Sequence, residues 1–149
     1  MPRANLFLDS SALFAGIASP TGAARALLLL GETGQVAITI SEQVVAETER
    51  AVARKLPRAL GEVRQAILAC QAQIWRDPSP EEVAANLDLI GHAADVPIVL
   101  AAMRAGVDFL VTLNRRHFID DPGVARRSGL QIGTPEEALA WVRERLREA

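Results

Sequence analysis

Short apolar runs and longer amphipathic segments alternate along the chain. Four of the apolar runs are too short to be helices, which predicts buried β-strands. These four runs are residues 6–9, 35–40, 108–112 and 130–132, and a weaker candidate for a strand covers residues 73–76. Because the runs contain few polar residues, we expect strands that are covered on both faces, as in a parallel sheet.

The amphipathic segments predict helices, and three of them have recognisable starts. Ser41 is expected to begin a helix, and the sequences SPEE at 79–82 and TPEE at 134–137 have the pattern of a capping box. The expected helices cover residues 10–18, 21–31, 41–56, 58–72, 79–91, 94–105 and a C-terminal segment from 134 onward. Residues 113–128 are polar and are predicted to form a loop with short turns.

The alternation of strands and helices predicts the fold class. We expect a three-layer α/β/α sandwich with a central, mainly parallel sheet. A length of 149 residues suits one well-buried core, so residues 1–149 are predicted to form a single domain. In open parallel sheets, ligands bind beyond the carboxyl ends of the strands. The residues that follow each strand are therefore the first candidates for chemistry.

Composition narrows the possible functions. Half of the residues are hydrophobic and 23% are charged, as in a globular protein, and the net charge of −2 gives no overall basic signature. Lys55 is the only lysine among 16 basic residues, so chemistry that needs a lysine elsewhere is excluded, whereas arginine suits phosphate binding. The single Cys70 excludes an internal disulfide, and His92 and His117 are too few and too far apart in the sequence for a histidine-rich metal site.

Two aspartates occupy positions that suit a site at the carboxyl edge of the sheet. Asp9 directly follows the first predicted strand, and Asp95 precedes the helix that begins near Pro97. For Asp95, the residues three and four positions later are apolar, so its side chain is expected to point inward. Each aspartate has an alternative role as a helix N-cap, which the sequence alone leaves open.

Glu47 is a third candidate, but the pattern of residues does not single it out. In the helix that begins near Ser41, Glu47 and Glu49 flank the apolar stripe on opposite sides. Most glutamates on helices are simply exposed to solvent. Periodicity therefore leaves the choice between the two glutamates open.

Asn114 and its neighbours follow the strand predicted at 108–112. Asn114 is expected to reach the same sheet edge as Asp9, whereas Asp108 begins that strand. Arg115 and Arg116 come next and offer donors for a phosphate-bearing substrate, although a solvated loop explains them equally well. Thr112 and Ser10 are further candidates for substrate binding.

Acids that converge from distant segments require a counter-charge. Packed carboxylates repel one another, and a hard divalent cation is the usual way to hold them together in ionised form. Oxygen ligands favour Mg²⁺ or Mn²⁺ over zinc. Such an ion can activate water for attack on a phosphodiester.

At this point the chain resembles the PIN-domain family, including VapC-like toxins of toxin–antitoxin pairs. The matching stretches are LFLDSSALFAG, SEQVVAETERAV, HAADVPIVLAAMRAGVDFLVT, TLNRRHF and LQIGTPEEAL, in the family's order. The resemblance implies that Asp9, Glu47 (not Glu49) and Asp95 are the family acids. The fourth position, often aspartate, falls on Asn114, whose amide brings no charge. Asp108, Asp120 and Asp121 are the candidates for an acid that compensates.

The resemblance also implies a function. We expect an endoribonuclease that cleaves RNA with water activated by Mg²⁺ or Mn²⁺, with Asp9, Glu47, Asp95 and Asn114 as the catalytic group. It further implies a homodimer, and a cognate antitoxin as partner. No apolar run approaches the roughly 20 residues that span a bilayer, so a cytoplasmic protein is expected.

Two other classes of function are alternatives. Because Asn114 brings no charge to the fourth position, the chain could be a PIN-like module that binds RNA or protein without cleaving it. Other phosphoryl-transfer enzymes with an aspartate after the first strand rank lower, because no lysine follows Lys55 and Ser11 stands where a phosphatase would have a second aspartate.

Overall fold

Five parallel strands form the centre of the computed structural model, which describes residues 3–148. They are β1 (Ala4–Leu8), β2 (Val36–Ser41), β3 (Gln73–Trp75), β4 (Phe109–Val111) and β5 (Gln131–Gly133). Their order in the sheet is β3-β2-β1-β4-β5, and every neighbouring pair is parallel. The strands predicted from the apolar runs are confirmed, including the weaker one at 73–76.

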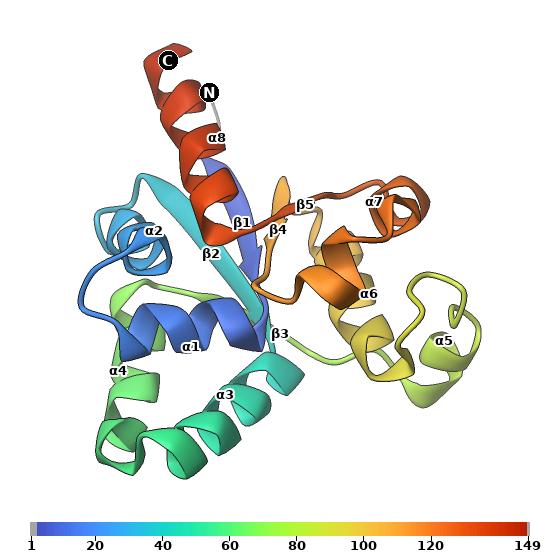
Figure 1. Ribbon diagram of the computed structural model, residues 1–149, viewed down its shortest axis with the longest axis horizontal. Helices are drawn as coiled ribbons and strands as arrows, with labels where there is room; N and C mark the ends of the chain where they lie inside the picture. Colours follow the sequence, from blue (N-terminus) through green and yellow to red (C-terminus); the bar gives the residue numbers. More distant parts are fainter. Residues whose placement is uncertain (1–2, 149) are drawn as a thin grey trace.

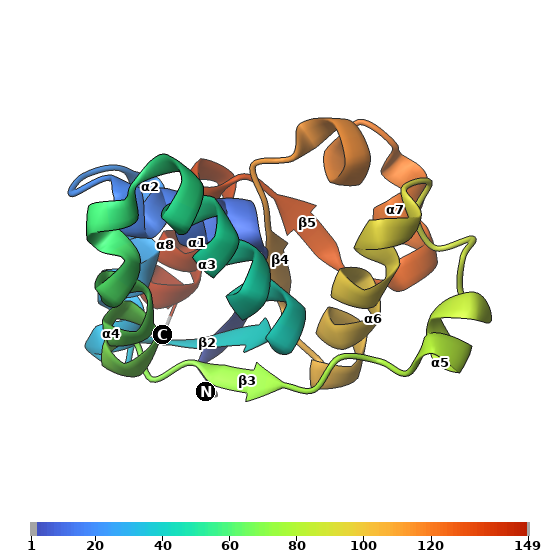
Figure 2. The same cartoon turned by 90° about the horizontal axis from the view of Figure 1, so that it is seen from below.

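Helices cover both faces of this sheet. They are α1 (Ser10–Ala18), α2 (Ala23–Glu32), α3 (Glu42–Lys55), α4 (Leu60–Ala69), α5 (Pro80–Ala84), α6 (Val96–Ala105), α7 (Pro122–Ser128) and α8 (Pro135–Glu148). Figures 1 and 2 show α1–α4 and α8 on one side of the strands and α6 and α7 on the other. This division follows from the right-handed crossovers, because the chain moves across the sheet in one direction from β1 to β3 and in the opposite direction from β3 to β5. The predicted three-layer α/β/α sandwich is confirmed.

Three short turns of other helical types connect these elements. They are η1 (Pro57–Ala59), η2 (Ala93–Asp95) and the π-helical turn η3 (Arg115–Ile119). Apolar side chains of the central strands, such as Leu6, Phe7 and Leu110, are buried completely. Since successive residues of a strand point to opposite faces, the core lies on both sides of the sheet.

Two expectations about helices were wrong. The helix expected over 79–91 ends at Ala84, although its capping box is present at Ser79. Beyond it, the side-chain amide of Asn86 donates to the carbonyl oxygen of Glu82 at 2.8 Å. This contact between side chain and backbone competes with continuation of the helix.

The segment 113–128 is also more regular than predicted. It contains η3 and α7, and α7 begins with Asp121 as N-cap and Pro122 in its first turn. An aspartate followed by proline is a recognised helix start, but α7 is short and the apolar pattern within it is weak.

Within residues 3–148, no single helix is both long and apolar enough to cross a membrane. The helices α1 and α2 together have the length and the composition of a membrane span, but the chain bends by 89° at the break between them.

Gly31 of α2 provides a test of core packing. A Cβ at this position would lie 2.8 Å from Cγ1 of Ile38 and 3.3 Å from the backbone oxygen of Cys70. We expect Gly31→Ala to lower the free energy of unfolding in urea by about 1 kcal/mol, because overpacking outweighs the gain in helix propensity.

The matched control is Gly61→Ala in the first turn of α4, where a Cβ would have no neighbour within 4 Å. This exposed change should raise the free energy of unfolding by about 0.5 kcal/mol. An unfolding midpoint for Gly31→Ala equal to that of Gly61→Ala would show that the core near Ile38 is looser than the contacts indicate.

Candidate active site

The point at which the strand order reverses lies between β1 and β4. From β1 the chain continues to β2 on one side, and β4 lies on the other side. Leu8 and Val111 are register partners at the carboxyl ends of these strands, and the next residues are Asp9 and Thr112. Crevices at such a reversal are the usual ligand sites of open α/β sheets.

Asp9 is a buried carboxylate at this crevice, with 5% of the residue exposed. Its Oδ1 accepts a hydrogen bond from the backbone nitrogen of Ala12 at 2.9 Å, so Asp9 is the N-cap of α1. Its Oδ2 accepts a hydrogen bond from the hydroxyl of Thr112. Burial raises the pKa of Asp9, and the hydrogen bonds from Ser11, Thr112 and Ala12 offset only part of this effect. The cap and a chemical role are therefore compatible.

Ser11 and Thr112 hold the carboxylate of Asp9 between α1 and the end of β4. The hydroxyl of Ser11 donates to Oδ1 of Asp9 at 2.6 Å and accepts from the backbone nitrogen of Leu113 at 2.9 Å. The hydroxyl of Thr112 accepts from the backbone nitrogen of Asn114 at 2.9 Å. Sequence reasoning did not assign Ser11 a role, because a serine in a first helical turn is an ordinary helix residue.

Asp95 precedes α6 but does not cap it with its side chain. Instead, Oδ2 of Asp95 lies 2.9 Å from Nδ1 of His117 and 3.3 Å from Nδ1 of His92. The side chain is 18% exposed, so it points into the crevice and not into the core. The negative charge of Asp95 contributes, after burial, to the raised pKa of Asp9. The two carboxylates therefore interact electrostatically across the crevice.

Glu47 and Glu49, which periodicity could not separate, have different surroundings. The side-chain nitrogen of Gln43 lies 3.4 Å from Oε2 of Glu47 and 3.0 Å from the carbonyl oxygen of Ala94, next to Asp95. Glu49 instead forms an ion pair of 3.3 Å with Arg64 of α4. Glu47 is thus the glutamate on the side of α3 that reaches toward Asp95.

Asn114 is the N-cap of η3. Its side-chain oxygen accepts from the backbone nitrogen of His117 at 3.1 Å, and its side-chain nitrogen lies 3.0 Å from Nδ1 of the same residue. The amide of Asn114 is therefore engaged with His117, and among residues 3–148 it makes no hydrogen bond to Asp9.

The candidates for substrate binding lie around the same sheet edge but are not equally accessible. Arg115 and Arg116 are exposed on η3, and Arg115 is 4.0 Å from Glu137 of α8. Ser10 is partly exposed at the start of α1, whereas Thr112 is buried and bonded to Asp9.

Two of the three acids considered as compensation for Asn114 are engaged elsewhere. Asp108, at the start of β4, accepts from the backbone nitrogen of Asn5 at 2.8 Å. Asp121 accepts from the backbone nitrogen of Gly123 and pairs with Arg127 at 3.1 Å. Asp120 is exposed at the end of η3.

The expectation that His92 and His117 are too far apart for a shared site was wrong. Their rings stack with centroids 4.3 Å apart and planes at 17°. Together with Asp95 they form the one group of three His, Cys, Asp or Glu residues within 3–148 whose ligand atoms all lie within 4.8 Å of one another. Distance along the sequence is a poor guide here because β4 and the segment before α6 both end at the crevice.

The acidic residues form a looser set than this cluster. Within the described part of the chain, Asp95 belongs to the cluster with the two histidines, and neither Asp9 nor Glu47 joins a group of three ligand residues within 4.8 Å. Mg²⁺ commonly retains several water molecules and is bound by only one or two carboxylates. The donor set of Asp9 and Asp95 fits such a partly hydrated ion better than an ion surrounded by protein ligands.

Comparisons with known proteins give a family and a fold. The model of the PIN domain family matches residues 5–116. A search of curated proteins found no match.

Three solved structures share the fold at low sequence identity. PAE2754 from Pyrobaculum aerophilum is 18% identical over 95% of this chain and 96% of its own, with a TM-score of 0.62. VapBC from Salmonella typhimurium, bound to DNA, is 19% identical over 89% of this chain and 98% of its own, with a TM-score of 0.61. VapC20 from Mycobacterium tuberculosis, a toxin that cleaves the sarcin-ricin loop, is 17% identical over 70% of this chain and 86% of its own, with a TM-score of 0.54.

Burial of Asp9 predicts the dependence of stability on pH when divalent ions are removed with EDTA. The folded-state pKa of Asp9 is raised, so the protein loses stability as the pH rises through that pKa. Asp9→Asn keeps an oxygen to cap α1 but carries no charge to desolvate. We expect the variant to unfold at a higher denaturant concentration than the parent at neutral pH, with a difference that shrinks at acidic pH.

Asp121→Asn is the control, for which we expect a change in stability of the opposite sign. The pKa of Asp121 is lowered by the hydrogen bonds from Gly123 and Arg127, so its ionised form stabilises the fold. This variant should be slightly less stable than the parent at neutral pH. A destabilised Asp9→Asn in EDTA would show that the hydrogen bonds to the carboxylate outweigh its burial.

Proposed function

The chain belongs to the PIN-domain family, and we propose that it is a metal-dependent endoribonuclease that hydrolyses phosphodiester bonds in RNA. The observation that carries the proposal is the buried Asp9 carboxylate at the strand-order reversal, within electrostatic reach of Asp95. A carboxylate whose ionised form is opposed by burial and by a neighbouring acid is a favourable place for a divalent cation. Residues 1–149 act as one domain in this proposal.

Each residue of the site has a proposed role. Asp9 and Asp95 bind Mg²⁺ or Mn²⁺, and Glu47 supports them from α3. When bound, such an ion supplies a Lewis acid for the phosphate and lowers the pKa of a coordinated water. Ser11 and Thr112 are positioning residues, because their hydroxyls fix the carboxylate of Asp9.

The neighbouring donors are proposed to hold the substrate. Arg115 and Arg116 are exposed beside the crevice and can form charge-assisted hydrogen bonds to phosphate oxygens. Ser10 is partly exposed at the start of α1, where its hydroxyl can donate to a phosphate oxygen. Asn114 completes the site by fixing η3 and His117.

The biological setting is also proposed. The solved VapBC structures from Salmonella typhimurium and Rickettsia felis are described as bound to DNA, and they share this fold. By analogy, this chain would act as the toxin of a toxin–antitoxin pair in the cytoplasm, as a homodimer inhibited by a cognate antitoxin protein. Cleavage of cellular RNA would then be its toxic activity.

The test is cleavage of RNA by purified protein with Mn²⁺ or Mg²⁺. Asp9→Asn and Asp95→Asn are each expected to reduce the cleavage rate by more than about 100-fold while the circular dichroism spectrum is kept, because each removes a charge from the site. Asp108→Asn is the matched control, since this acid lies at the amino end of β4 and asparagine can still accept the bond from Asn5. Its rate should stay close to that of the parent.

The outcome that would contradict the proposal is cleavage by both site variants at the parent's rate. If the parent itself binds RNA but does not cleave it, and calorimetry shows no heat with Mn²⁺, the chain is a PIN-like binding module. The observation that favours this alternative is Asn114, which stands where the family pattern often has an aspartate and whose amide is engaged with His117.

A further inference from the structure

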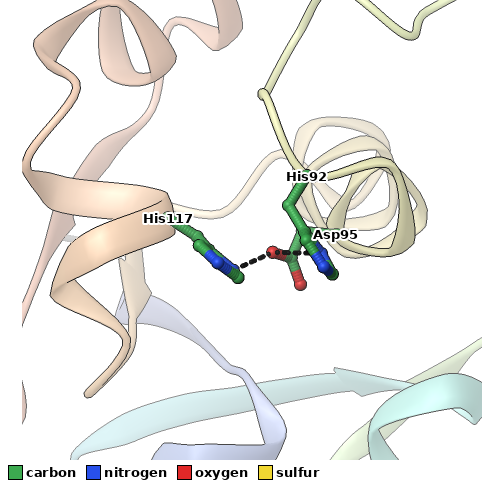
Figure 3. Close-up of side chains that lie close together, drawn as sticks. All are labelled: His92, Asp95 and His117. Atoms are coloured by element: carbon green, nitrogen blue, oxygen red, sulfur yellow. Dashed lines mark hydrogen bonds and ion pairs between the residues drawn. The ribbon is translucent and has the colours of Figure 1, made fainter.

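Two imidazole rings and one carboxylate lie close together, as Figure 3 shows. His92 precedes η2, Asp95 is the last residue of η2, and His117 comes from η3, which follows β4. One oxygen of Asp95 faces both rings, at 3.3 Å from Nδ1 of His92 and 2.9 Å from Nδ1 of His117. We propose that His92, Asp95 and His117 bind a transition-metal ion of the imidazole-preferring class, with Zn²⁺ as the representative ion.

The spacing of the three donors is that of ligands on one ion. Tetrahedral zinc with bonds of about 2.0–2.1 Å separates neighbouring ligand atoms by about 3.3 Å. The distance from Asp95 to Nδ1 of His92, 3.3 Å, matches this value, and the distance to Nδ1 of His117, 2.9 Å, is somewhat shorter. All three ligand atoms lie within 4.8 Å of one another, so small rotations of the rings bring them around a common centre.

The carboxylate of Asp95 is available for this role. As the residue before α6 it is placed to cap the helix, yet its side chain makes no cap hydrogen bond and faces the rings. The side chains of His92 and His117 are 52% and 29% exposed, so an ion can reach them from solvent. Three protein ligands leave the fourth position of a tetrahedral ion open to water or a phosphate oxygen.

The fold holds His117 in place for this contact. The Asn114 side chain accepts from the backbone of His117 and lies 3.0 Å from its Nδ1. An ion on Nδ1 would replace the second of these contacts and leave the first intact. The π-helical turn of η3, closed by the bond of 2.7 Å from the nitrogen of Asp120 to the oxygen of Arg115, is a geometry often found at functional sites.

The choice of ion follows from the donor atoms. Imidazole suits zinc, copper and nickel, whereas Mg²⁺ prefers oxygen. The cluster is therefore chemically distinct from the proposed acidic site, although both use Asp95. The zinc site does not require RNA cleavage, so it stands or falls separately from the proposed nuclease activity.

Calorimetric titration of EDTA-treated, dialysed protein with ZnCl₂ tests the site. We expect one equivalent of Zn²⁺ to bind at micromolar concentration. His92→Ala and His117→Ala should each weaken the affinity by at least about tenfold, because each removes one of three ligands. Asp121→Asn is the matched control: this exposed acid pairs with Arg127, belongs to neither site, and its variant should bind Zn²⁺ with the parent's affinity.

Nuclear magnetic resonance of the imidazole nitrogens supplies a second measurement on the unaltered protein. The chain contains two histidines, and both belong to the cluster, so every imidazole signal reports on this site. Stoichiometric Zn²⁺ should shift one nitrogen of each ring. Unshifted imidazole signals, or a histidine variant that binds Zn²⁺ as tightly as the parent, would leave the cluster as a hydrogen-bonded His–Asp–His group without a metal.

The experiment also separates the two proposals. Loss of Zn²⁺ binding in Asp9→Asn would assign the ion to the acidic site and overturn the inference. Zinc bound through the histidines in a protein that does not cleave RNA would keep the inference and remove the proposed activity.

Discussion

The site depends on the burial of the Asp9 carboxylate, which costs free energy of desolvation. This carboxylate lies where the strand order reverses, between β1 and β4. A parallel sheet of this order creates the crevice, because the connections leave from β1 and β4 toward opposite sides. The carboxylate remains there because backbone and hydroxyl donors from α1 and β4 surround it. The fold therefore holds a buried carboxylate at this crevice, where a bound cation would strongly stabilise its ionised form.

The other candidate residues of the site lie on three connections that differ in helical geometry. Glu47 lies on the regular helix α3, and Asp95 lies at the junction of a 3-10 turn with α6. His117 lies on a π-helical turn whose next residue, Phe118, is buried in the core. The buried Phe118 and the polar His117 are therefore adjacent in the chain, and the packing of Phe118 fixes the direction of the His117 side chain.

The sequence predicted most of the fold and the sheet edge beside which the candidate residues lie. The apolar runs located all five strands, and the strand ends placed Asp9 and Asn114 near the same edge, because strand burial and parallel order leave a clear periodicity. Three features had weaker signals. Asn86 ends α5 through a side-chain bond, and α7 is too short to show amphipathic periodicity. The pairing of His92 with His117 depends on how two loops fold over the crevice, which no local pattern encodes.

The side chain of Gln43 spans the gap between α3 and the segment that leads into α6. It reaches Glu47 on its own helix and the carbonyl oxygen of Ala94 on the other side. The two contacts of this one amide tie the helix that carries Glu47 to the residue that precedes Asp95. The spacing between these two acids therefore depends on a glutamine side chain that belongs to neither of them.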